Sequence, residues 1–191
     1  HNHPDHMCDL IPFLFGSRYQ LDARKKDLEI VAGPGFQDFF DKLMAAFKHW
    51  LKPTEYKLNI LEIDEGVYEF ESLKVQVGKV KHIAMSRGYR FTNDRGKSVA
   101  LSGDTDYCKG MIELGRGADL MVLECAWPDE EKSEGHLGPT LAGKLAAEAD
   151  CKKICLTHFY PPCDLGNIRK KVQDIYTGEL VLARDLMQFE L

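Results

Sequence analysis

HNHPDH at residues 1–6 decides how the rest of the sequence is interpreted, because three histidines and one aspartate share this short stretch. In an extended segment, residues two apart point to the same side, so the His1 and His3 imidazoles can bind one metal ion together. Asp5 and His6 enter the next helix and turn toward a second ion. A purification tag or a disordered tail is the alternative, and the residues interrupting the histidines argue against a tag.

Further candidate ligands lie where predicted strands end or loops begin. His82 follows VGKVK, His136 lies in EGHLG, His158 lies in KICLTHFYP, and Asp104 follows a glycine in SVALSGDT. Loops at strand ends are where α/β folds place ligand-binding groups. Taken singly, a lone histidine is more often structural and Asp104 is a turn residue. Their combination with residues 1–6 favours a metal site in which Asp104 bridges two cations.

The rest of the sequence predicts a layered α/β fold in one domain spanning residues 1–191. Apolar residues at helical spacing predict an amphipathic helix at 36–51, which ends before Pro53. Runs of β-branched, aromatic and other apolar residues predict strands at 56–63, 67–70, 73–80, 89–92, 98–101, 118–125, 153–156 and 179–183. A turn at 94–96 joins the fourth and fifth of these, and further helices are predicted at 139–149 and 165–176.

The composition excludes some classes of function. The chain has 191 residues, a net charge of −5 and 44% hydrophobic residues, which is typical of a globular protein with one substantial core. No apolar run approaches the roughly 20 residues that span a bilayer, and the negative charge provides no basic field for a long nucleic acid. The six cysteines form no CxxC pair, so we expect reduced, mostly buried thiols and a cytoplasmic protein.

Together, these motifs resemble the metallo-β-lactamase superfamily and, within it, the ribonuclease Z-like branch of hydrolases. The resemblance covers nearly the whole chain and rests on four stretches in family order: HNHPDH at 1–6, VKHIAMSRGYR at 80–90, SGDT at 102–105 and LTHFYP at 156–161. It implies a four-layer αββα fold with several strands before the first motif. Because the sequence as given lacks them, we expect the natural protein to be longer and part of its N-terminal half to be missing here.

The resemblance also implies the roles of the site residues. It assigns the first ion to His1, His3, His82 and Asp104, and the second ion to Asp5, His6, Asp104 and His158. It implies that Asp5 and His136 are catalytic, with His136 donating a proton to the departing alkoxide. Glu124 either orients His136 or is a structural carboxylate at the end of a strand. Two divalent ions are expected, zinc first, with manganese or iron as alternatives.

The resemblance favours a phosphodiesterase that acts on a small or cyclic phosphodiester through a metal-bridging hydroxide. Transfer RNA is disfavoured as a partner, because the 21 residues between His82 and Asp104 leave no room for the extended arm of many ribonuclease Z enzymes, and no other stretch provides it. Lys81, Arg87 and Arg90 either contact phosphate or are ordinary surface charges of the hairpin. A homodimer would be common for such a protein.

Other functions stay open at this stage. The same scaffold could hydrolyse an ester or lactone, process the 3′ end of tRNA, or bind metal without turnover. A mature N-terminal histidine that holds copper would require a secreted chain, which the cysteine pattern and the family motifs both disfavour.

Overall fold

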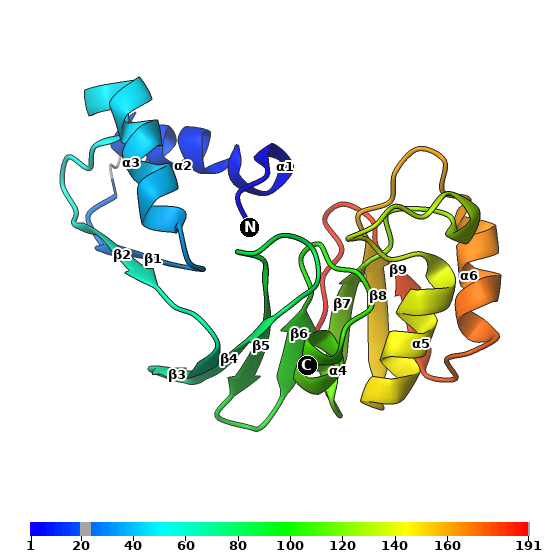
Figure 1. Ribbon diagram of the computed structural model, residues 1–191. Helices are drawn as coiled ribbons and strands as arrows, with labels where there is room; N and C mark the ends of the chain where they lie inside the picture. The colour runs from blue at the N-terminus through cyan, green and yellow to red at the C-terminus, as the bar shows by residue number, and fades with distance from the viewer. Residues whose placement is uncertain (20–23, 191) are drawn as a thin grey trace. The chain divides into compact units, whose positions relative to one another are not determined.

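The computed structural model describes residues 1–19 and 24–190. The chain divides into two compact units, residues 1–64 and 65–191, whose helices and strands are labelled in Figure 1. Within the described ranges, no helix combines the length and the apolar character that crossing a membrane requires.

The first unit combines a small parallel sheet with helices. Its elements are α1 (Pro4–Met7), α2 (Leu10–Tyr19), β1 (Leu28–Ala32), α3 (Phe36–Phe47), the 3₁₀ helix η1 (Lys48–Leu51) and β2 (Leu58–Glu62). β1 pairs in parallel with β2, and Leu14, Phe36, Phe40 and Leu51 form the buried core. The amphipathic helix predicted at 36–51 ends at Phe47, because Lys48 has a φ of 53° and breaks the α-helical repeat.

The second unit contains all the remaining strands. Its elements are β3 (Gly66–Phe70), β4 (Leu73–Lys79), β5 (Arg87–Asn93), β6 (Ser98–Leu101), α4 (Lys109–Gly115), β7 (Leu120–Glu124), the 3₁₀ helix η2 (Asp129–Glu131), α5 (Pro139–Ala149), β8 (Lys153–Thr157), α6 (Leu165–Gln173) and β9 (Glu179–Leu182). The seven strands form one sheet in chain order. Every strand predicted for this unit is confirmed, with small shifts at the ends, and the helix at 139–149 is confirmed with its predicted bounds.

The direction of the strands positions the loops of the second unit. β3 to β6 are antiparallel to their neighbours, whereas β6 to β9 are parallel. As a result, β4, β6, β7 and β8 all run in the same direction, and the loops that follow them leave from one edge of the sheet. This edge is where open α/β sheets bind their ligands.

Helices cover one face of this sheet. Figure 1 shows α5 and α6 side by side against β7 to β9, and α4 packs against β4, β5 and β6. The fully buried Met121 and Leu123 of β7, together with Ile154 and Leu156 of β8, belong to the same apolar core as Leu145 of α5. The near-continuous apolar runs of β7 and β8 are explained by this burial.

Four elements were not predicted from the sequence, namely α2, β1, α4 and the short 3₁₀ helix η2. The stretch LIPFLFGSRY of α2 contains a proline and a glycine, and its apolar residues form no stripe at helical spacing. The strand β1 has the sequence LEIVA, in which apolar and polar residues do not alternate regularly, and the seven residues of α4 are too few to reveal helical periodicity. Tertiary packing rather than local pattern therefore selects these elements.

The cysteine side chains are free thiols in different environments. Cys125, Cys151 and Cys155 are buried, Cys108 and Cys163 are half-buried, and Cys8 is exposed. Cys8, which lies just after the short helix α1, is the exposed exception among thiols that were expected to be mostly buried.

Asp119, just before β7, is bonded to residues at or just before the start of both neighbouring strands, β6 and β8. Its carboxylate accepts a hydrogen bond from the Lys152 ammonium at 2.8 Å and another from the Ser98 N–H at 2.9 Å. Lys97 Nζ lies 3.6 Å away. The hydrogen bonds from Lys152 and Ser98 lower the pKa of Asp119 from 3.8 to about 2. Ionised Asp119 therefore stabilises the folded second unit.

Asp119→Asn should lower the free energy of unfolding at pH 7 by about 1 kcal/mol, the scale of a hydrogen-bonded, partly exposed ion pair. Because the folded pKa lies below the unfolded value of 3.8, this contribution is complete above about pH 4 and is lost as the pH falls through 2. Urea unfolding between pH 2 and 7 measures the difference. Asp94→Asn, at an exposed position of the β5–β6 turn, is the matched control. A pH-independent difference would contradict the interpretation.

Candidate metal centre

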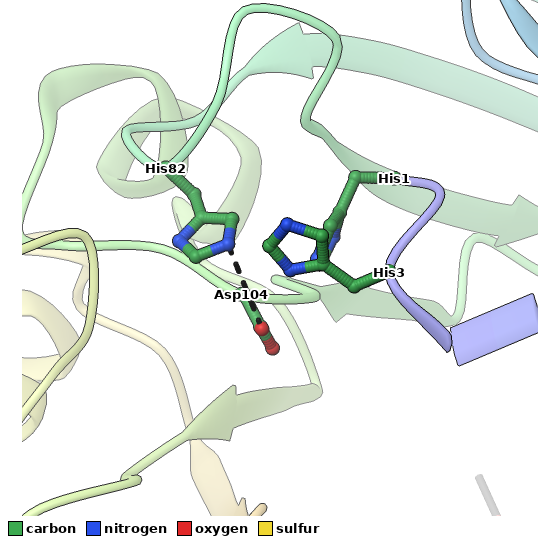
Figure 2. Close-up of side chains that lie close together, drawn as sticks. All are labelled: His1, His3, His82 and Asp104. Atoms are coloured by element: carbon green, nitrogen blue, oxygen red, sulfur yellow. Dashed lines mark ion pairs between the residues drawn. The ribbon is translucent and has the colours of Figure 1, made fainter. Parts of the chain in front are cut away.

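Asp104 lies at the centre of the candidate site in the second unit. It follows β6 in the SGDT stretch, and Gly103 before it has a φ of 56°, which confirms the tight turn expected from the glycine. The Asp104 side chain is buried, with the residue 2% exposed. His82, which follows β4, faces it with Nε2 3.9 Å from Asp104 Oδ2, as Figure 2 shows. The topology of the sheet brings these two sequence-distant residues together.

The His82 ring is oriented by the protein backbone. His82 Nδ1 lies 2.9 Å from the carbonyl oxygen of Gly135. A carbonyl can only accept, so Nδ1 carries the hydrogen, and in the neutral ring Nε2 presents a lone pair toward the Asp104 carboxylate. A lone pair that faces a carboxylate at 3.9 Å is the arrangement expected of two ligands of one cation.

His158 reaches the same carboxylate from the end of β8. Its Nε2 lies 3.4 Å from Asp104 Oδ1, so His82 and His158 face different oxygens of Asp104. The backbone of His158 has a φ of 63°, a left-handed conformation that is uncommon for residues other than glycine and costs about 1–3 kcal/mol. Such outliers cluster at functional sites.

His136 completes the group of imidazoles in this unit. It lies in the loop between β7 and α5, and its ring centroid is 4.8 Å from that of His82 and 6.0 Å from that of His158. His136 Nδ1 is 2.9 Å from Glu124 Oε1. Donor atoms of Glu124, His136 and His158 all lie within 4.8 Å of one another. The structure thus brings together five residues that the sequence singled out.

Glu124, the last residue of β7, is the buried partner of His136. Its two oxygens also accept hydrogen bonds from the backbone N–H groups of Thr105, Ala126 and Leu137, at 3.0, 3.1 and 3.2 Å. Burial raises the pKa of Glu124 to about 7, although these donors favour its ionised form. Burial also lowers the pKa of His136. Glu124 is therefore hydrogen-bonded both to His136 and to three backbone N–H groups, contacts that agree with either alternative from the sequence.

In the first unit, the HNHPDH motif gathers its own donor side chains. The ring centroid of His1 lies 4.4 Å from that of His3 and 4.3 Å from that of His6, and His6 Nε2 lies 3.4 Å from Asp5 Oδ2. His3 has extended backbone, and Pro4 is the first residue of α1, a position that proline favours. The expectation that Asp5 and His6 enter a helix is therefore confirmed.

The basic residues near His82 have structural partners. Arg90 donates to the carbonyl oxygens of Leu114 and Arg116 and to Ser98 Oγ. Arg87 is not the exposed charge of an ordinary hairpin. It is 7% exposed and donates to the carbonyl oxygens of Ala84 and Ser86 in the loop that follows His82.

Two residues close to the imidazoles were not singled out from the sequence. The Tyr160 ring lies 5.1 Å from that of His158 and 6.1 Å from that of His136. Gly135 contacts His82 through its carbonyl oxygen. Tyr160 follows His158 by two positions and Gly135 precedes His136, so closeness to the predicted ligands was the available signal.

Comparison with known proteins identifies the family. Residues 1–159 match the family model described as the beta-lactamase superfamily domain. The chain belongs to this superfamily. An uncharacterized protein of Mycobacterium tuberculosis is 32% identical over 167 residues, which cover 84% of this chain and 60% of the relative. The chain therefore spans about three fifths of the length of this relative.

Two further comparisons agree with the resemblance seen in the sequence. A ribonuclease Z from Brevibacillus brevis is 28% identical over 215 residues, covering 84% of this chain and 66% of the relative. The structure is also similar to the metallo-beta-lactamase fold protein YhfI from Bacillus subtilis, with a TM-score of 0.83 and 24% identity. That match covers 100% of this chain and 75% of the other. The metallo-β-lactamase fold predicted from the motifs is confirmed.

The contacts of Glu124 predict that replacing it with glutamine destabilises the protein despite the equal size of the two side chains. In either orientation, the amide NH₂ of Glu124→Gln faces a backbone N–H that has lost its acceptor. We expect the free energy of unfolding to fall by about 1–3 kcal/mol, as measured by urea unfolding. Glu134→Gln, at an exposed position in the same loop, should change it little. Equal stability of the two variants would show that the Glu124 carboxylate is dispensable.

Proposed function

We propose that the protein is a dinuclear metal-dependent phosphodiesterase that hydrolyses a small or cyclic phosphodiester. The family consists of metal-dependent hydrolases, and one relative is named as a ribonuclease, an enzyme that cleaves phosphodiester bonds. The observation that carries the proposal is the arrangement of His82 and His158, whose nitrogens face opposite oxygens of the buried Asp104.

The donor set of the proposed site suits divalent ions. We assign His1, His3, His82 and Asp104 to the first ion, and Asp5, His6, Asp104 and His158 to the second. Imidazole and carboxylate ligands suit zinc, with manganese and iron as alternatives. The oriented ring of His82 supports this assignment, because metal-binding histidines usually donate their other N–H to a carbonyl or carboxylate.

The proposed mechanism divides the chemistry between the ions and the protein. The ions, when bound, supply Lewis acidity that activates water at neutral pH and stabilises charge on the phosphate. His136 is hydrogen-bonded to Glu124 through Nδ1, so in its imidazolium form Nε2 carries the proton that is donated to the departing alkoxide, which leaves a neutral imidazole. Glu124 holds that ring in place. We assign Asp5 a second role as acceptor of a proton from the attacking water.

Processing of tRNA 3′ ends is the second candidate, because the Brevibacillus relative is named ribonuclease Z. The net charge of −5 and the short stretch between His82 and Asp104 favour a smaller substrate. Hydrolysis of an ester or lactone would use the same ions but needs no phosphate contacts. A cytoplasmic location and a homodimer remain part of the proposal.

Metal content and turnover test the proposed function together. Protein purified without a tag or chelator should contain about two divalent ions per chain by plasma emission and should hydrolyse bis-p-nitrophenyl phosphate. Dialysis against a chelator should abolish turnover, and zinc or manganese should restore it. Two ions with turnover only of p-nitrophenyl acetate or a lactone would replace the phosphodiesterase by an esterase. Cleavage of a tRNA precursor in preference to small phosphodiesters would favour the second candidate.

The proposed role of His136 predicts a dependence on the leaving group. His136→Ala should lower kcat roughly 10²–10⁴-fold on a cyclic nucleoside phosphodiester, because a sugar alkoxide needs a proton to leave. On bis-p-nitrophenyl phosphate the loss should be much smaller, because p-nitrophenolate leaves without one. His49→Ala, in η1 of the first unit, is the control and should leave both rates unchanged. Equal losses of His136→Ala on the two substrates would rule out the proton donor.

A further inference from the structure

Asp106, two residues after the predicted bridging ligand, makes more contacts than a turn residue needs. It is 7% exposed, and its Oδ1 accepts a hydrogen bond from the Tyr107 N–H at 2.8 Å. Its Oδ2 accepts from Lys132 Nζ at 3.0 Å and from the Gly135 N–H at 3.4 Å. Lys132 and Gly135 both belong to the loop between β7 and α5. Asp106 therefore holds this loop from the side of β6.

The backbone of Asp106 makes a second connection, to the strand end that carries His82. The Asp106 N–H donates to the Lys81 carbonyl oxygen at 2.7 Å, and Lys81 Nζ lies 3.6 Å from Asp106 Oδ2. One residue thus joins the segment just before His82 to the loop that carries His136.

Gly135 connects this loop to His82 through the two polar groups of its backbone. Its N–H bonds to Asp106, while its carbonyl oxygen lies 2.9 Å from His82 Nδ1. Its φ of 85° requires glycine, and a Cβ at this position would lie 2.9 Å from the same nitrogen of His82. The contact between the Gly135 backbone and the His82 ring is therefore close and leaves little room for movement.

Glu124 fixes the other end of the same segment. It accepts the Leu137 N–H at 3.2 Å, and Leu137 is fully buried. Residues 135–137 are therefore held by Asp106 on one side and by Glu124 on the other, with His136 between the two carboxylates.

We propose that Asp106 is a positioning residue that, through the Gly135 peptide, fixes the ring orientation and the tautomer of His82. With Asp106 in place, Gly135 presents its carbonyl oxygen to Nδ1, and Nε2 is kept unprotonated toward Asp104. Without it, Lys132 and Gly135 lose their common acceptor, and the His82 ring loses its fixed partner.

The test compares Asp106→Asn with Asp119→Asn. Asp119, just before β7, is a matched control because its carboxylate also accepts a backbone N–H and lies close to two lysines. Long-range ¹H–¹⁵N correlation spectra of the metal-free, ¹⁵N-histidine-labelled protein report the tautomer of each ring. His82 should be Nδ1-protonated in the wild type and in Asp119→Asn. In Asp106→Asn it should shift to a mixture with the Nε2-protonated form. Unchanged His82 signals in Asp106→Asn would overturn the proposal.

A second readout is zinc affinity, measured by competition with a chromophoric chelator. Asp106→Asn should bind roughly 10–100-fold more weakly, as is usual when the partner that orients a ligand is lost, while Asp119→Asn should bind like the wild type. This readout rests on the proposed function, whereas the tautomer does not. If the wild type binds no zinc, the proposed function fails, and the spectra alone decide the role of Asp106.

If circular dichroism shows that Asp106→Asn does not fold, the His82 tautomer is measured in Lys132→Gln instead. It removes the ammonium from Asp106 but leaves the bond to the Gly135 N–H, so we expect a smaller shift of the His82 tautomer in the same direction. Wild-type His82 signals in a folded Lys132→Gln variant would count against the proposal in that case.

Discussion

The candidate site of the second unit depends on the burial of one carboxylate, that of Asp104. Removing an ionised carboxylate from water costs several kcal/mol unless cations or donors compensate it, and this residue is 2% exposed. The groups that face it, His82 and His158, come from the ends of β4 and β8. They reach it because β4, β6 and β8 run in the same direction. The strand order of the sheet therefore brings the two histidines to the buried carboxylate.

Two other buried carboxylates at this edge, those of Glu124 and Asp106, are compensated for the loss of water by hydrogen-bond donors. Glu124 accepts three backbone N–H groups and one imidazole nitrogen, and Asp106 accepts two backbone N–H groups and a lysine ammonium. Hydrogen bonds to ionised groups are stronger than those between neutral groups, so each carboxylate also fixes the loops that supply its donors. Asp104 differs because imidazole nitrogens, which also serve as metal ligands, face both of its oxygens. Asp104 is therefore the carboxylate suited to bind cations, whereas Glu124 and Asp106 hold the backbone of the surrounding loops.

Much of the second unit could be predicted from the sequence because its elements carry strong local signals. The apolar runs of β7 and β8 and the helix at 139–149 stand out, and the glycine before Asp104 indicates the turn that the structure shows. Residues at strand ends were good candidates for the site, since parallel strands bring such ends to one edge. The family motif then connected positions far apart in the chain, which no local pattern can do.

The features of the site that the sequence did not predict depend on backbone atoms, which nearly every residue type supplies. The partner of His82 Nδ1 is a backbone carbonyl, and the partners of Glu124 include three backbone N–H groups. Any residue supplies these atoms, so the sequence does not reveal them until the topology places the loop. Gly135 is a partial exception, because its positive φ and the nearby His82 ring leave glycine as the residue that fits. The geometry of the imidazoles therefore rests on the loop between β7 and α5, and substitutions there that alter no ligand can still change how the ligands are held.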